Sequence, residues 1–210
     1  MSWVLLKYYS HRCIFSPINS PLGLDKSIRH EISLDAQADV FQRHLLLAKR
    51  FQRTLTVHCV QAWGRLLEVI SAEDLNSASV SASSTVPLPP LSIVLHGCNT
   101  IPVDLIRSFL KLRHMVIYFS ITVGRAYGDD ARDASFLERC VAIPLTRILF
   151  ETDCPDGLPA IFRDTLYCNS PSLLQEGALM VASKIAKQVN RSVDEVLELV
   201  FENSLTAYHL

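Results

Sequence analysis

Apolar residues along this chain are arranged in two ways, as short continuous runs and as stripes with helical spacing. The continuous runs are typical of strands in a parallel sheet, because such strands are covered on both faces. These runs lie at residues 91–96, 115–124 and 147–151, and residues 54–59, TLTVHC, predict a further short strand. Stripes that repeat every three or four residues predict helices between and after the strands. These stripes lie at residues 35–51, around 66–70, 103–110, 131–142, 172–189 and from 193 onward.

Strands that alternate with helices at this spacing predict βα units around a parallel sheet, so the expected fold class is α/β. One segment interrupts the pattern. Residues 71–90, SAEDLNSASVSASSTVPLPP, are rich in serine and end in prolines. Because this composition offers few side chains to bury, we expect a surface loop inside the domain. The last helix begins with a capping box, Ser192 to Glu195, in which each side chain caps the backbone of the other residue.

Composition limits the class of protein. The chain has 210 residues, of which 49% are hydrophobic and 20% charged, so it is large enough for one domain with a substantial core. The net charge of −1 gives no electrostatic reason to expect a protein that binds nucleic acid by neutralising many phosphates. A small local basic patch stays compatible with that charge.

The cysteines and the lengths of the apolar runs indicate in which cellular compartment the protein is expected. The six cysteines are scattered, without a CxxC pair or zinc-ribbon spacing, which favours a reduced, intracellular protein of the cytoplasm or nucleus. No apolar run reaches the roughly 20 residues of a membrane span. The first 24 residues contain Lys7 and Arg12 and no acid, so organelle targeting stays open as an alternative.

Polar residues follow three of the predicted strands. The strand at 54–59 ends at His58, the strand at 91–96 ends at His96, and the strand at 147–151 runs into Asp153. The carboxyl ends of parallel strands meet at one edge of a sheet, where α/β proteins place their chemistry. Two imidazoles and a carboxylate are a ligand set for a divalent metal ion in a hydrolytic site. The three residues are therefore candidate metal ligands.

Two other interpretations of these residues stay open. A single histidine at a strand end is more often a hydrogen-bonded or core residue than a ligand. The acids of the last motif also fit a helix N-terminus or turn, because residues 154–157, CPDG, are good turn material. Cysteines at positions 59, 98 and 154 suggest a thiolate zinc site instead. Alternation along a strand points Cys59 to the opposite face from His58, which disfavours a mixed site.

Several motifs closely resemble the TatD-related deoxyribonucleases. They are GLDKS and the segment through TLTVHCVQAW within residues 23–70, IVLHG at 93–97, IPLTRILFETDCPDGLP at 143–159 and the closing segment from residue 181 onward. In that closing segment Asn203 stands at the position of the asparagine usual for the family. The resemblance covers most of residues 22–210, and the ETD.P motif after the VHC and LH strands is quite specific.

The resemblance implies a metal-dependent phosphodiesterase of DNA on a (β/α) TIM-type barrel. By match, His58, His96 and Asp153 are metal ligands, the ions being magnesium, manganese or zinc, and Asp153 also orients or deprotonates the attacking water. Glu151 is expected to support a ligand rather than to bind metal itself. Only four clear βα units match, so the barrel is expected to be incomplete.

The chain departs from the family before residue 22. No H-x-H pair ends an early strand, Pro21 stands where the family has a bridging glutamate, and residues 1–21 are expected to be an unrelated leader. Two function hypotheses follow. One is a TatD-like nuclease, either active or impaired by the missing ligands, and the other is a non-catalytic remnant or splice form that acts as an interaction module. A related amidohydrolase of small amides or esters fits the motifs less well.

Overall fold

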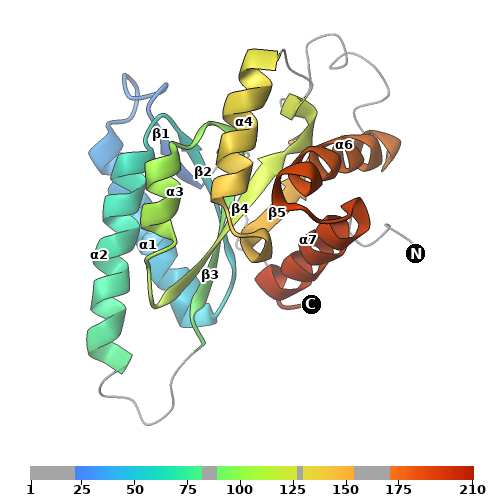
Figure 1. Ribbon diagram of the computed structural model, residues 1–210. Helices are drawn as coiled ribbons and strands as arrows, with labels where there is room; N and C mark the ends of the chain where they lie inside the picture. Colours follow the sequence, from blue (N-terminus) through green and yellow to red (C-terminus); the bar gives the residue numbers. More distant parts are fainter. Residues whose placement is uncertain (1–21, 82–88, 127–129, 154–170) are drawn as a thin grey trace. The chain divides into compact units, whose positions relative to one another are not determined.

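The computed structural model describes residues 22–81, 89–126, 130–153 and 171–210 (Figure 1). The predicted leader, residues 1–21, lies outside the described residues. Five strands form one sheet in the order β1-β2-β3-β4-β5. Their bounds are β1 Gly23–Asp25, β2 Leu55–Val60, β3 Leu91–His96, β4 Met115–Thr122 and β5 Ile148–Glu151.

The order of the strands in the sheet is also their order along the chain. The described registers are parallel: β1 pairs with β2, Gly23 opposite His58, and β4 pairs with β5, Thr122 opposite Glu151. Sequential parallel strands are the pattern of a (β/α) barrel, whereas doubly wound sheets reverse their order at one point. The α/β prediction is confirmed, and each of the four predicted strands begins within one residue of its predicted start. Among the described residues the sheet ends at β1 and β5, so these strands do not close a barrel.

Helices follow the strands along the chain. Among the described residues, no helix is long and apolar enough to cross a membrane. The helices have the bounds α1 Leu34–Phe51, α2 Trp63–Ser81, α3 Val103–Phe109, α4 Asp130–Ala142, α6 Pro171–Val189 and α7 Val193–Tyr208, with short 3-10 turns η3 Cys98–Thr100, η4 Val123–Ala126 and η5 Leu145–Arg147. The described residues divide into two compact units, one of residues 22–81, 89–95, 108–118 and 206–210 and one of residues 96–107, 119–126, 130–153 and 171–205.

In the first unit, α1 packs on the edge strand β1 (Figure 1). Its buried face carries Ala38, Phe41, Leu45 and Ala48, which repeat at helical spacing as the sequence predicts. Gln37 extends from the same helix to the backbone of Asp25. The Asp25 N–H donates to Gln37 Oε1 (2.7 Å), and Gln37 Nε2 donates to the Asp25 carbonyl (3.0 Å). This side chain therefore pairs backbone groups of β1 that a neighbouring strand would otherwise have to satisfy.

The prediction of a surface loop over residues 71–90 is wrong for its first half, because α2 continues to Ser81. Residues 82–88 lie outside the described part of the chain. Two acids inside the helix are buried, Glu73 (3% exposed) and Asp74 (7% exposed). Glu73 pairs with Lys49 of α1. Asp74 accepts the backbone N–H groups of Arg113 (3.1 Å) and His114 (2.7 Å), just before β4. These contacts join α2 to α1 and to the segment before β4, and the serine-rich composition does not predict them.

In the second unit, the last helix α7 contacts the start of β5. Asn203 on α7 donates through Nδ2 to the carbonyls of Leu145 (2.7 Å) and Ile148 (2.9 Å), and thereby fixes the start of β5. The predicted capping box is confirmed, since the Ser192 N–H donates to Glu195 (2.8 Å) and the Glu195 N–H donates to Ser192 Oγ (3.2 Å). The contacts of Asn203 thus fix the start of β5, the strand that ends at the acidic motif.

Candidate functional site

The acidic motif lies at the carboxyl end of β5. Glu151 is the last residue of the strand, and Asp153 follows two residues later. The backbone of Asp153 adopts the left-handed conformation, with φ 50°. Aspartate tolerates this region better than most residues that carry a side chain, but the conformation is still costly and is typical of functional sites. The turn directs the Asp153 carboxylate back to the end of β3.

His96, at the end of β3, lies between these two carboxylates. Its Nδ1 is 3.0 Å from Glu151 Oε2, and its Nε2 is 3.1 Å from Asp153 Oδ1. Burial by itself lowers the pKa of the imidazole. Hydrogen bonds to Asp153 and Glu151, together with the attraction of both charges, outweigh burial and raise the pKa of His96 to about 10. Without a metal ion the ring is therefore held as an imidazolium, with one carboxylate on each nitrogen.

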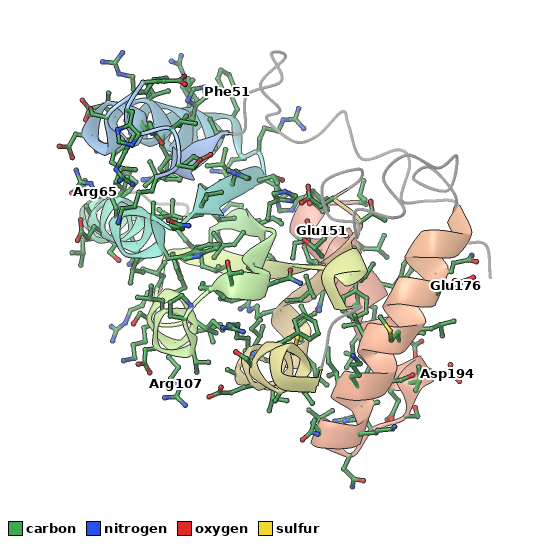
Figure 2. All side chains as sticks on the ribbon, turned by 90° about the horizontal axis from the view of Figure 1, so that it is seen from above. Phe51, Arg65, Arg107, Glu151, Glu176 and Asp194 are labelled. Carbon is green, nitrogen blue, oxygen red and sulfur yellow. The ribbon has the colours of Figure 1, made fainter. Side chains whose placement is uncertain are left out.

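Glu151 is held by four donors, two on each oxygen; Figure 2 labels its side chain. Oε1 accepts the Gly97 N–H (2.7 Å) and Thr122 Oγ1 (3.1 Å). Oε2 accepts Ser120 Oγ and lies against His96 Nδ1. A carboxylate that accepts two hydrogen bonds on each oxygen cannot rotate without breaking some of them. Glu151 therefore fixes the orientation of the His96 ring.

A second layer of contacts holds Thr122 and Gly97. The Asn99 side chain pairs with the backbone of Thr122 in both directions, from Nδ2 to the carbonyl (3.0 Å) and from the N–H to Oδ1 (2.8 Å). Gly97 has a left-handed backbone (φ 59°), which turns its N–H to Glu151 at little cost because glycine has no Cβ. The end of β3 and the end of β4 are thus joined around one carboxylate.

Of the three predicted ligands, the structure brings together His96 and Asp153. His58 lies on β2 in the other unit, where it is half-buried and its backbone N–H donates to the Leu22 carbonyl (2.9 Å). Cys59 is buried while His58 is partly exposed, as the alternation predicts. Burial raises the pKa of the Cys59 thiol to about 12, which disfavours a thiolate zinc site there. Cys154 lies outside the described residues.

The donor set fits a divalent ion at one edge of His96. An imidazole nitrogen and a carboxylate oxygen face each other at Nε2, while a second carboxylate anchors Nδ1, the arrangement that orients metal-binding histidines. Glu151 cannot share that ion, because it contacts the opposite nitrogen of the ring. In the described part of the chain, no group of three His, Cys, Asp or Glu residues is placed to hold a metal. Among the described residues, His96 and Asp153 would thus supply two ligands to such an ion, and its other ligands would have to come from elsewhere.

Sequence reasoning missed Ser120 and Thr122. The apolar residues of the run MVIYFSITVG predict a strand, and they draw attention away from the two hydroxyls near its carboxyl end. These hydroxyls stand two residues apart, and therefore on one face, in a strand buried along most of its length. Buried hydroxyls need partners. The same strand-end argument that selects His96 therefore also selects these two residues.

The pKa of His96 leads to a test on the protein without metal. The ordinary pKa of histidine, 6.5, applies to the unfolded state, and the pKa of about 10 applies to the folded state. Below pH 6.5 both states bind the proton, and the stabilisation by the charged His96 ring is complete. Between pH 6.5 and about 10 this stabilisation is progressively lost. We expect His96→Gln to lower the free energy of unfolding by about 3 kcal/mol near pH 6.5. The difference should shrink as the pH approaches 10. Urea unfolding of both proteins in EDTA at three pH values measures this, and a difference that does not change with pH would contradict the assignment.

Comparison with known proteins identifies relatives of this chain. The family model of the TatD related DNases matches residues 20–209. The human 3'-5' RNA nuclease TATDN2 is 28% identical over 192 residues, which are 90% of this chain and 22% of that protein. The chain thus spans about a fifth of the length of the curated relative that it matches.

Solved structures show the same fold. An uncharacterized amidohydrolase from Saccharomyces cerevisiae matches 98% of this chain and 68% of its own, with a TM-score of 0.67 and 14% identity. A TatD family hydrolase from Entamoeba histolytica matches 90% and 62%, with a TM-score of 0.60 and 15% identity. The TatD homologue YJJV from Escherichia coli matches 91% and 63%, with a TM-score of 0.56 and 19% identity. These neighbours confirm the α/β barrel-type architecture, and the match over residues 20–209 shows that the chain belongs to the TatD related DNase family.

Proposed function

We propose that this chain is a metal-dependent hydrolase of phosphodiester bonds in nucleic acid. The observation that carries the proposal is the pair formed by His96 Nε2 and Asp153, 3.1 Å apart, with Glu151 anchoring the other ring nitrogen. Family membership supports the reaction class, because TatD proteins are generally metal-dependent hydrolases. The pair lies at the carboxyl ends of parallel strands, where barrel enzymes place catalytic residues.

Each residue of the cluster has a role in this proposal. A divalent ion held at the Nε2 edge would supply Lewis acidity. His96 would bind it through Nε2, while Glu151 holds the ring in that orientation and keeps Nδ1 protonated. Asp153 would bind the ion as well, and its carboxylate would orient the attacking water and accept its proton. The prediction that His58 is also a ligand stays a prediction from its sequence position.

The chemistry of the proposed ligands bears on which of the three metals binds. Imidazole and carboxylate together suit zinc and manganese, and magnesium favours sites with more oxygen ligands. We therefore propose manganese or zinc ahead of magnesium.

The nucleic acid is either DNA or RNA. The family takes its name from DNases, whereas TATDN2, which is 28% identical, is named as an RNA nuclease. Both substrates share the phosphodiester that the site would cleave, and they differ at the 2′-hydroxyl. We propose RNA as the better substrate, because the match to TATDN2 covers 90% of this chain.

The purified chain tests the proposal with DNA and RNA oligonucleotides of one sequence, labelled at the 5′ end. We expect shortening from the 3′ end in manganese or zinc, faster on RNA, and no cleavage in EDTA. Asp104→Asn serves as a control, because this carboxylate is exposed on α3 and pairs with Arg107. Cleavage that persists in EDTA, or no cleavage of either polymer with any of the three metals, would contradict the proposal.

A further inference from the structure

We propose that the hydroxyl groups of Ser120 and Thr122 on β4 are positioning groups for the metal ligand His96, acting through Glu151. The inference rests on the proposed function, because it assumes that His96 binds a divalent ion. It adds to the site two residues that do not touch the ion. Their role would be to set the rotamer of a carboxylate that in turn sets the rotamer of the ligand.

The geometry gives each hydroxyl a separate oxygen of Glu151. Thr122 Oγ1 donates to Oε1 at 3.1 Å, and Ser120 Oγ donates to Oε2. The backbone N–H of Gly97 occupies the second position on Oε1, and His96 Nδ1 occupies the second position on Oε2. Rotation of the carboxylate away from His96 would break at least one hydroxyl contact.

Ser120 and Thr122 are buried, which indicates that their hydroxyls serve as hydrogen-bond donors to the Glu151 carboxylate. Ser120 is 3% exposed and Thr122 is 0% exposed, in a strand whose other members are nearly all apolar. A valine at position 122 would fill the same volume, and an alanine at position 120 would need no partner. Both would leave a partly buried carboxylate with fewer donors, which costs more than the loss of an ordinary hydrogen bond.

Thr122 is itself held in place. The Asn99 side chain makes two hydrogen bonds with the Thr122 backbone, so this residue cannot shift along the strand to follow a displaced carboxylate. The arrangement is therefore rigid from Asn99 to the ring of His96. Supporting residues of this kind usually change metal affinity by about 10–100-fold when they are removed.

Manganese binding to the purified chain, measured by calorimetry, tests the inference without using activity. We expect Thr122→Val and Ser120→Ala each to weaken binding about tenfold, and Thr122→Ser, which keeps the hydroxyl, to stay within about threefold of the wild type. Ser204→Ala is the matched control, because this buried hydroxyl donates only to the Val200 carbonyl of its own helix. In hydrolysis, the manganese concentration that gives the half-maximal rate should rise about tenfold in the two weakened variants, while KM for the oligonucleotide at saturating manganese stays unchanged.

Thermal unfolding of each variant separates positioning from stability. If Thr122→Val and Ser120→Ala lower the melting temperature but bind manganese like the wild type, the inference is overturned while the proposed function stands. If the wild type itself binds no manganese, zinc or magnesium, the proposed function fails and the inference fails with it. Should Thr122→Val not fold, Ser120→Ala decides the question, because it removes a single oxygen atom.

Discussion

Replacing Asp153 with asparagine should lower the rate of phosphodiester hydrolysis by at least about a thousandfold and weaken manganese binding at least about tenfold. The carboxylate contacts His96 Nε2 at 3.1 Å and is the only charged ligand that the described cluster offers to an ion at this edge. The neutral amide loses the charge that attracts the ion. It also loses the basicity needed to accept a proton from water.

Asparagine is the appropriate replacement because of the backbone. Asp153 has a left-handed conformation, with φ 50°, which asparagine adopts about as readily as aspartate. Alanine at this position would add strain and confuse a loss of chemistry with a loss of folding. Asp104→Asn, on the exposed surface of α3, controls for the change of net charge. An Asp153→Asn protein with wild-type turnover and wild-type manganese affinity would remove this residue from the site.

Replacing Gly23 with alanine should destabilise the first unit by about 3 kcal/mol or more, which is in the range of severe overpacking. A Cβ built at this position lies 1.9 Å from the carbonyl oxygen of His58, on the paired strand β2. The contact is with backbone, so no side chain can rotate away to relieve it. The φ of Gly23, +150°, adds strain for any other residue. We expect β1 to separate from β2, and urea unfolding should show the loss.

Gly64→Ala is the matched control, because a Cβ at this helical position meets nothing within 4 Å. Alanine favours helix over glycine by about 1 kcal/mol, so this variant should be as stable as the wild type or more so. Comparable destabilisation by the two substitutions would show that Gly23 is not constrained by the pairing of β1 with β2.

Much of the fold follows from local pattern. The continuous apolar runs predict β3 to β5, because such runs are typical of strands covered on both faces. β2, which is buried at alternate residues, is predicted as a short strand without such a run. The strand-end argument selects His96 and Asp153 from the sequence alone, since the carboxyl ends of parallel strands must meet at one edge. The capping box from Ser192 to Glu195 is likewise readable, because its contacts span only three residues.

The tertiary structure decided what depends on partners far apart in the chain. Asp74 is a buried acid in a serine-rich stretch only because the backbone of residues 113 and 114 passes beside it. Composition contains no information about such contacts between distant residues. It therefore predicts a loop over residues 71–90, although the first half of this stretch is helical. The same holds for the site. The sequence placed Glu151 beside Asp153 in the motif, but only folding showed that the two carboxylates contact opposite nitrogens of His96. The structure also shows that Ser120 and Thr122 donate hydrogen bonds to Glu151. The sequence could not predict this, because the acceptor of a hydroxyl in an apolar run is known only from the tertiary structure.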